Sequence, residues 1–428
     1  MKNRSNGHAA DRNLPRLVTG GEVFSDGTGI ELARHVEDSD RASLLFSDGT
    51  RSTITPVVKR HGRIYEPPII NQSIWRELVL PTRVTPCHSA RELLDELSKS
   101  AAHFVGLPEK LAAIAGRIPP ASWIIRALPI APAVSITGPA AARGNRFVQW
   151  LQCVCRHALP ISGVSPAALR SLPSGLDFTL IISQSSISDK LAKLLDEAGR
   201  RDTKIPHRGG LIDLYGLQIV QSESVLGADS WCFRSLKIPI LPTVDELPIF
   251  DAALQRQLAD DFQSKLAGYR FANFNKAAAL RIDASNITHS LRELAHGLAA
   301  TTPDDADLQR KSFDLLREDD LELRSAIWTD PKTVAIESMM FACSECAGQK
   351  KYVSELAELA YEIRKRRGVD EKIDAGAFGK TLGDLGFGFA KAPRDAKGVK
   401  LQLSEAACSR AQQLARDLNL PELESVGN

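Results

Sequence analysis

The sequence predicts an α/β protein built around a parallel sheet, with a small β-rich module before the sheet and a helical unit with a two-stranded wing after it. Between about 130 and 245, short apolar runs alternate with segments of helical periodicity, which is the pattern of βαβ units and a parallel sheet. Hydrophobic residues make up 43% and charged residues 25% of the 428 residues, so the chain can bury large cores.

Residues 1–15 are polar, lack the apolar stretch of a signal peptide, and are expected to be a disordered leader. Residues 16–75 are expected to form the β-rich module. The pentapeptide Phe-Ser-Asp-Gly-Thr occurs in this module twice, at 24–28 and 46–50. Asp-Gly between apolar runs favours a tight hairpin turn, so each copy predicts a hairpin.

Residues 76–245 are expected to form the core. Residues 89–128 carry helical periodicity, with Ser89 as N-cap of a first helix and a second helical stretch from about 108 to 128. Strands are then predicted near 134–136, 160–162, 178–182, 211–220 and 236–241, with helices near 147–155, 166–172 and 189–201 between them. The continuous apolar run Phe178 to Ile182 is typical of a buried parallel strand.

A small-residue loop follows the strand at 134–136 and precedes a helix. The phosphate-binding loop has this context and the pattern Gly-x-x-x-x-Gly-Lys-Ser/Thr, in which backbone N–H groups hold phosphate, the Lys reaches its terminal oxygens and the hydroxyl binds magnesium. Here the segment reads Gly138-Pro139-Ala140-Ala141-Ala142-Arg143-Gly144-Asn145-Arg146. Without a gap, Arg143, Gly144 and Asn145 stand in the Gly-Lys-Ser places; with one inserted residue, Gly144, Asn145 and Arg146 do. The Lys and the hydroxyl are absent in both alignments.

The second half of an ATPase site is an apolar strand that ends in Asp-Glu, where the Asp binds magnesium and the Glu orients water. The run Phe178 to Ile182 ends instead in Ser183-Gln184. Loss of the Lys, the hydroxyl and both carboxylates together predicts a P-loop-type core that does not hydrolyse ATP. We expect no cofactor, although the remaining backbone donors leave room for weak ATP binding.

From about Tyr65 to Asn273, the order of segments resembles the helicase-type, AAA+-like ATPase core of bacterial and phage primase–helicase-like proteins. The resemblance covers roughly half of the chain and includes Tyr65-Glu66-Pro67-Pro68, the loop at Gly138, the strand at 178–182, the segment 203–209 and the strand at 238–243. It implies that Arg234, just before the last strand, corresponds to an arginine that reaches a neighbouring subunit's nucleotide. Related ATPase subunits, or further copies of this chain, are therefore expected as partners; a surface arginine is the alternative interpretation of Arg234.

Residues 246–333 are expected to be a helical connector and 334–428 a winged-helix-like domain. The pattern predicts helices at 352–367 and 375–385, a wing from Phe387-Gly388-Phe389 and residues 399–403, and a last helix capped by Ser404. This order resembles a winged helix in the same terminal place as in primase–helicase relatives.

Residues 350–400 contain twelve Lys or Arg against eight Asp or Glu, an excess of four. The whole chain has a formal charge of only +2, so nucleic-acid contacts must come from such local patches. We expect DNA as a partner, contacted through Arg364, Lys365, Arg366, Arg367, Lys380, Lys391, Arg394, Lys397 and Lys400. The run Arg364 to Arg367 has a second interpretation, since cations at a helix C-terminus also satisfy the helix dipole.

The remaining motifs predict no metal site and no membrane partner. Cys343-x-x-Cys346 lacks a second pair at zinc-site spacing and is interpreted as a helix face. The most apolar window, 121–136, contains Arg126 and two prolines, so it is too short and too broken to cross a bilayer. Seven cysteines without framework spacing fit a reducing cytoplasm.

The function expected from the sequence is that of a catalytically inactive, helicase-like and DNA-associated accessory or scaffold protein linked to replication or mobile elements. Two alternatives stay open. One is a working nucleotide-dependent, DNA-processing ATPase in which Arg143 and Arg146 replace the usual Lys. The other is a protein–protein scaffold that does not bind DNA.

Overall fold

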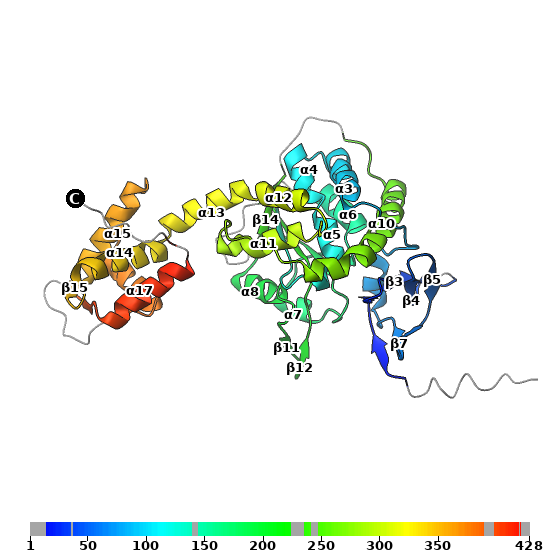
Figure 1. Ribbon diagram of the computed structural model, residues 1–428, viewed down its shortest axis with the longest axis horizontal. Helices are drawn as coiled ribbons and strands as arrows, with labels where there is room; N and C mark the ends of the chain where they lie inside the picture. The colour runs from blue at the N-terminus through cyan, green and yellow to red at the C-terminus, as the bar shows by residue number, and fades with distance from the viewer. Residues whose placement is uncertain are drawn as a thin grey trace, which may run out of the picture. The chain divides into compact units, whose positions relative to one another are not determined.

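The computed structural model describes residues 14–35, 37–138, 144–223, 235–240, 247–388, 398–418 and 420. The chain forms two compact units (Figure 1). Unit 1 comprises Met1–Ala284 and Ser290–Leu316, and unit 2 comprises Ser285–His289 and Arg317–Asn428. The finer division into five parts stays a prediction. Within the described ranges, none of the helices combines the length and the apolar character that a membrane span needs.

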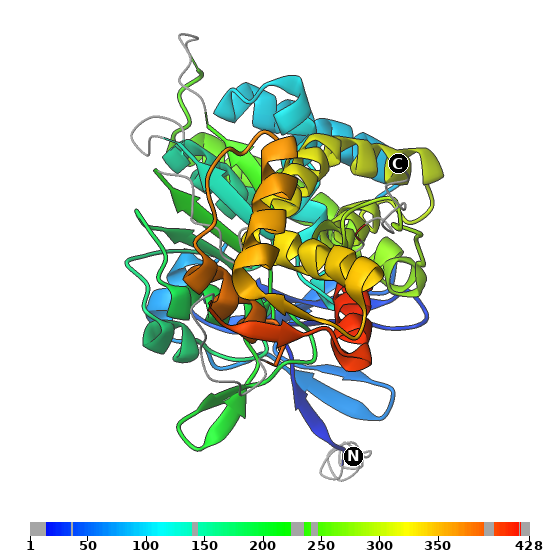
Figure 2. The same cartoon turned by 90° about the vertical axis from the view of Figure 1, so that its left-hand side faces the viewer.

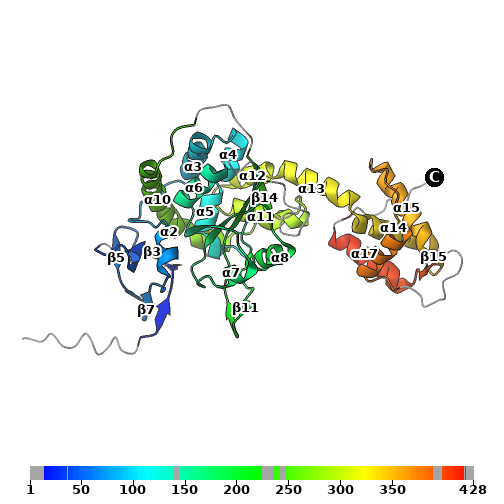
Figure 3. The same ribbon diagram turned by 180° about the vertical axis from the view of Figure 1, so that it is seen from behind.

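The N-terminal module of unit 1 contains two small sheets, a four-stranded antiparallel sheet in the order β2-β3-β4-β5 and a three-stranded sheet in the order β1-β7-β6. These strands gather on one side of unit 1, beside α2 and α10 (Figure 3). Their bounds are β1 Arg16–Val18, β2 Gly21–Val23, β3 Gly29–Arg34, β4 Ala42–Ser47, β5 Ser52–Thr55, β6 Val58–Arg60 and β7 Arg63–Glu66.

Both predicted hairpins are confirmed, because β2 pairs with β3 and β4 pairs with β5 across the two Asp-Gly turns. The turns are built alike. Asp26 Oδ1 accepts hydrogen bonds from the backbone and hydroxyl of Thr28, and Asp48 Oδ1 accepts the same pair from Thr50. Hydrogen bonds from the backbone of Arg51 and from Thr50 lower the pKa of Asp48 to about 2.

The core of unit 1 is a five-stranded, fully parallel sheet in the order β14-β8-β13-β10-β9, which confirms the α/β fold class. Numbered along the chain, this order is 5-1-4-3-2. Apolar side chains of β10, such as Leu180 and Ile182, pack with those of α8, such as Leu191 and Leu195. The strands are β8 Ala133–Thr137, β9 Ala158–Ser162, β10 Thr179–Ser183, β13 Gln218–Ser222 and β14 Ser235–Pro239.

Helices complete unit 1, and the predicted N-cap Ser89 is confirmed. Ser89 Oγ accepts a hydrogen bond from Glu92 N at the start of α3, and Ser188 Oγ accepts one from Leu191 N at the start of α8. The helices are α2 Gln72–Glu77, α3 Ala90–Val105, α4 Glu109–Ala115, α5 Ile118–Trp123, η2 Ile125–Ala127, α6 Asn145–Val154, α7 Pro166–Arg170, α8 Asp189–Ala198, α10 Ala252–Ala279, α11 His289–Ala299 and α12 Ala306–Leu315.

Two predicted elements are wrong in extent. The helix expected over 108–128 is divided into α4, α5 and η2, because Gly116 ends α4 and Pro119-Pro120 can only open the next helix. The strand expected over 211–220 is divided into β12 (Gly210–Ile212) and β13. Asp213 forms a turn there by accepting a hydrogen bond from Tyr215 N. β12 pairs with β11 (Ile205–His207) in a hairpin that projects from unit 1 (Figure 2).

A buried cluster of charges fixes the N-terminal module to the core of unit 1. Glu31 on β3 is fully buried, and its carboxylate accepts hydrogen bonds from Arg156, which follows α6, and from Arg270 on α10. His157 Nε2 lies 3.0 Å from Glu31 Oε1. Burial by itself would raise the pKa of Glu31, but the two guanidinium groups hold it well below its usual range.

Unit 2 contains five helices and a two-stranded ribbon in its described part. Its core includes Met339, Leu356, Phe378, Leu382 and Leu401. The ribbon pairs β15 with β16. The predicted pairing of the wing strand with Phe387-Gly388 is therefore wrong: Phe387 and Gly388 form no strand, and the strand at 400–402 pairs with residues that precede α15. Residues 389–397 lie outside the described ranges. The elements are α13 Arg317–Thr329, α14 Pro331–Cys346, β15 Lys350–Tyr352, α15 Val353–Arg366, α16 Ala375–Asp384, β16 Lys400–Gln402 and α17 Glu405–Asp417.

Candidate nucleotide site and nucleic-acid interface

The carboxyl edge of the parallel sheet is the first candidate site. In the chain order 5-1-4-3-2, the strand β8 lies between β13 and β14, where the direction of the connections changes. Ligands of open α/β sheets bind at such a switch point, outside the carboxyl ends of the strands. The loop that begins at Gly138 leaves β8 at this point; the end of β13 lies next to it, and the end of β10 lies one strand farther away.

Two glycines allow the backbone to approach closely around this loop. Gly138 has φ of +142° and donates its N–H to Ser222 O at 3.1 Å; a Cβ there would lie 2.3 Å from Ile240 O. Gly144 precedes the first residue of α6, and a Cβ there would lie 2.0 Å from Gln221 Nε2. Side chains larger than hydrogen would therefore displace neighbours at both positions. Arg143 lies outside the described residues.

Ser183 and Gln184, which stand in the places of the Asp-Glu pair, make structural hydrogen bonds. Ser183 Oγ donates to Gln221 Oε1 at 3.0 Å. The backbone N of Gln184 donates to Gln221 O at 3.1 Å, and its side-chain Oε1 accepts from Val164 N at 3.2 Å. Gln184 therefore ties the loop after β9 to the end of β10.

Gln221 is the residue of this site that the sequence reasoning missed. It is buried near the end of β13, where its side chain accepts a hydrogen bond from Ser183 and lies against Gly144, the N-cap of α6. The sequence carried little signal for it, since β13 also contains the polar residues Gln218 and Ser222. Its partners come from segments distant in the sequence.

The other predicted residues of the loop do not gather over it. Asn145 is exposed in the first turn of α6. Arg146 is half-buried and directs Nη1 to Phe104 O at 3.4 Å, so its guanidinium contacts the C-terminal turn of α3. Arg234 lies outside the described residues, and its predicted role stays a prediction.

One described carboxylate, Glu223, follows β13 at this edge, but the side chains in the places of the predicted magnesium and water ligands do not fit a magnesium–nucleotide complex. Magnesium in such sites is held by carboxylates together with phosphate oxygens, whereas Thr137, Ser183, Gln184 and Gln221 are all neutral. Gln221 also occupies the space against Gly144 where the first turn of the helix would receive phosphate. Within the described ranges, no three His, Cys, Asp or Glu side chains gather in an arrangement that could hold a metal ion.

The predicted cations of unit 2 divide into two groups. Arg367 Nη1 lies 2.8 Å from Glu337 Oε2, and its guanidinium stacks over Trp328 at 5.3 Å from the ring centroid. Arg364 lies 3.3 Å from Glu371, with most of its side chain buried. These two arginines connect α15 to its neighbours. The structure thus gives them a packing role at the end of the helix.

The second group faces solvent. Arg366 and Lys380 are exposed, and Lys365 is exposed with its ammonium 5.5 Å from the centroid of the Tyr361 ring. The Coulombic attraction of Tyr361 and Asp370 raises the pKa of Lys365, so this side chain stays cationic. Three more predicted contacts, Lys391, Arg394 and Lys397, lie outside the described residues.

The ribbon of β15 and β16 brings Lys350, which the sequence reasoning did not select, to the same face as the predicted Lys400. Tyr352 pairs with Lys400 and Lys350 with Gln402 across the ribbon, and alternation places these four side chains on one face. The Lys400 ammonium lies 4.7 Å from the centroid of the Tyr352 ring. Lys350 is exposed, whereas Leu401 is buried on the opposite face. The Lys350-Lys351-Tyr352 sequence was a visible signal, but only the pairing brings it beside Lys400.

No protein-family model and no curated protein matches the chain. Solved structures match it over much of its length at low similarity. The apo form of the NrS-1 C-terminal region is 11% identical, with 87% of this chain and 96% of that chain covered and a TM-score of 0.34. A full-length MCM homolog from Methanopyrus kandleri is 10% identical over 68% and 76% of the two chains, with a TM-score of 0.34. Drosophila ORC bound to DNA is 12% identical, with 85% of this chain and 96% of that chain covered and a TM-score of 0.18. Similarity at this level carries no argument about activity, and the proposals below rest on the residues of this chain.

Proposed function

We propose that this chain is a catalytically inactive, helicase-like protein that acts as a DNA-associated accessory or scaffold in replication or in a mobile element. The observation that supports it best is the neutral end of β10. Ser183 and Gln184 stand where hydrolysis needs an Asp and a Glu, and both side chains form hydrogen bonds within the fold. Neutral oxygens that already accept or donate such bonds neither bind magnesium strongly nor activate water.

The test of inactivity is a steady-state ATPase assay with and without single- and double-stranded DNA. We expect no turnover above background. Turnover on the order of one per second, in the usual range for enzymes, that is lost in Arg146→Ala would contradict the proposal. That outcome would favour the alternative in which Arg143 and Arg146 replace the usual Lys.

The carboxyl edge of the sheet can retain weak affinity for a nucleotide anion. The first turn of α6 offers backbone N–H groups, but Gln221 Nε2 lies against Gly144 in front of them. Gln221→Ala should therefore strengthen ATP binding in a calorimetric titration. The control is Gln149→Ala, which removes an exposed Gln from α6 and should leave ATP binding unchanged. Absence of binding at millimolar ATP in both variants would reject the retained affinity.

The DNA part of the proposal rests on unit 2. We propose that this unit is winged-helix-like and contacts phosphates with Lys350 and Lys400 on the ribbon, together with Arg366 and Lys380. Tyr352 between these lysines adds an aromatic face beside the cations, which suits nucleic acid better than a simple solvated surface. Phosphate contacts carry little base information, so we expect weak sequence preference.

Fluorescence anisotropy of the full chain at several salt concentrations tests this interface. Each phosphate contact contributes about 0.9 to the slope of log affinity against log salt. Removing Lys350 and Lys400 together should lower the slope by about two and weaken all duplexes equally. If DNA affinity does not change with salt or with the two substitutions, or if no DNA binds at low salt, the alternative of a protein–protein scaffold is favoured. Related ATPase subunits or further copies of the chain are its proposed partners.

A further inference from the structure

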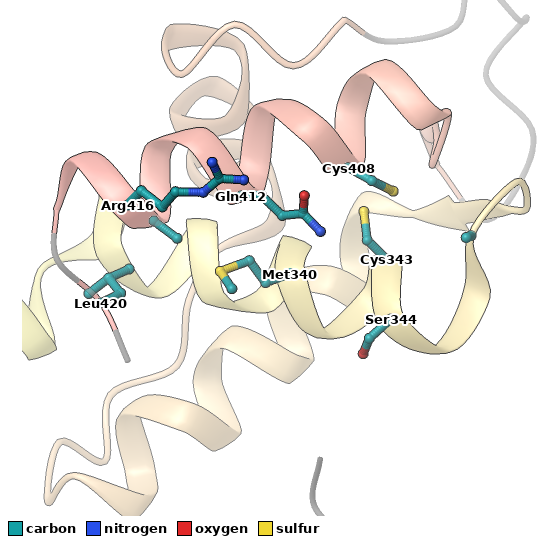
Figure 4. A pocket seen from close by; sticks show the side chains of 9 residues that line it. Met340, Cys343, Ser344, Cys408, Gln412, Arg416 and Leu420 are labelled. Atoms are coloured by element: carbon teal, nitrogen blue, oxygen red, sulfur yellow. The ribbon is translucent and has the colours of Figure 1, made fainter. Parts of the chain in front are cut away.

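A groove of about 550 Å³ lies between α14 and α17 in unit 2 (Figure 4). Its walls combine apolar, sulfur and polar side chains: Met340, Cys343, Cys408, Gln412, Arg416 and Leu420. The groove opens to solvent, so a small molecule can reach the two cysteines that line it. None of these residues belongs to the nucleotide or DNA sites proposed above.

The two cysteines come from different helices and meet at one end of this groove. Cys343 is in the last turns of α14 and Cys408 is in the first turn of α17. Figure 4 shows their sulfur atoms turned toward each other, and Cys408 Sγ donates to Leu403 O at 3.9 Å. Both are only half-buried, unlike Cys153 and Cys155 in unit 1. Burial and the neighbouring Cys408 thiol raise the pKa of Cys343 to about 12, so Cys343 keeps its proton.

We propose that Cys343 and Cys408 form a disulfide when they meet a small-molecule disulfide of the glutathione class. The Cys408 thiolate attacks one sulfur of oxidised glutathione, a mixed disulfide forms, and one glutathione thiolate leaves. Cys343 then loses its proton and attacks the Cys408 sulfur, which releases the second glutathione. The protein loses two electrons and two protons, and one oxidised glutathione becomes two reduced molecules.

The bond would join the two ends of the DNA-facing part of unit 2. The segment between the cysteines contains β15, α15, α16 and β16, so the link closes all of them into one loop. Such a link restricts the unfolded chain and stabilises the folded unit. In a reducing compartment, a pair of this kind responds to the redox state rather than serving as a permanent cross-link.

The test is oxidation of the full chain in a glutathione redox buffer, followed by mass spectrometry of the intact protein and of its non-reduced peptides. The expected product is lighter by two hydrogens and yields a Cys343–Cys408 linked peptide. Oxidation should also raise the unfolding temperature of unit 2 by about 5 °C or more. The peptide map of the unsubstituted protein decides the matter even if a variant fails to fold.

Two variants sharpen the result. Cys346→Ser lies one turn from Cys343 on α14 and outside the groove lining, so it should still form the link. Cys343→Ser should not form it and should instead carry one glutathione on Cys408, since the mixed disulfide then has no second thiol to release it. Mixed disulfides on both cysteines of the unsubstituted protein, a link that uses Cys346, or no oxidation of either thiol would each overturn the proposal.

Discussion

The buried carboxylate of Glu31 provides the sharpest test of how the N-terminal module is held to the core. The change is Glu31→Gln, which keeps the size of the side chain and removes its charge. Side-chain exposure is 0% for Glu31, 1% for Arg156 and 3% for Arg270. Arg156 Nη2 lies 2.9 Å from Glu31 Oε1, and Arg270 Nη1 lies 2.8 Å from Oε2. The substitution therefore leaves two guanidinium groups buried against a neutral amide.

Removing one partner of a buried ion pair costs about 3–5 kcal/mol, because the remaining charge stays desolvated. Asp177 offsets only part of this cost, since its Oδ2 lies 3.5 Å from Arg156 Nη1. We expect a loss of about 3–5 kcal/mol in the free energy of unfolding of unit 1. Urea unfolding followed by the fluorescence of the buried Trp123 and Trp150 measures it.

The matched control is Asp307→Asn, also in unit 1. Asp307 pairs with Arg310 at 3.1 Å, but the two side chains are 71% and 73% exposed. Exposed pairs contribute at most about 1 kcal/mol. If Glu31→Gln loses no more than Asp307→Asn, the reasoning about burial is refuted.

The pH dependence gives a second check on the same residue. Because the folded pKa of Glu31 is depressed, its contribution is fully present above the unfolded pKa of about 4.3 and is lost as the pH falls toward the folded pKa. The difference in stability between the unsubstituted protein and Glu31→Gln should therefore be constant from pH 7 to about pH 5 and shrink below pH 4. A difference that grows on acidification would contradict the assignment.

Three further predictions concern packing and the unit 2 arginines. In α10, Gly268→Ala should destabilise unit 1 by about 1–3 kcal/mol, because a Cβ would lie 1.9 Å from Thr85 O; thermal unfolding measures this, and an unchanged transition would refute the close approach. In α16, Gly379→Ala should instead stabilise unit 2 by about 0.5–1 kcal/mol, since its Cβ would make an ordinary 3.4 Å contact with Val353 and alanine favours the helix. Arg367→Ala should destabilise unit 2 by about 1–3 kcal/mol with little effect on DNA affinity, because it leaves the Glu337 carboxylate buried without its arginine. Arg366→Ala should weaken DNA binding with little effect on the stability of unit 2. If both substitutions weaken DNA binding equally in the anisotropy assay, the division of the cations into two groups is contradicted.

Local features of the chain were predictable from the sequence by itself. The two Asp-Gly hairpins, the caps Ser89 and Ser404 and the buried strand at 178–182 are all found in the structure. Each depends on residues within one turn or one strand, where the chain carries its own signal. The neutral pair Ser183-Gln184 at the end of that strand was visible for the same reason.

Only the tertiary structure decided which distant residues meet. Glu31 contacts partners 125 and 239 residues away in the sequence. Ser183 on β10 contacts Gln221 on the neighbouring strand β13, 38 residues away. The partner of β16 was mistaken for the same reason, since β15 precedes α15 in the sequence, about fifty residues before the strand with which it pairs. Hydrophobic periodicity reports which face of an element is buried, but it does not report against which element. A polar side chain such as Gln221, or a cation such as Arg367, acquires its role only from the partner that the fold brings to it.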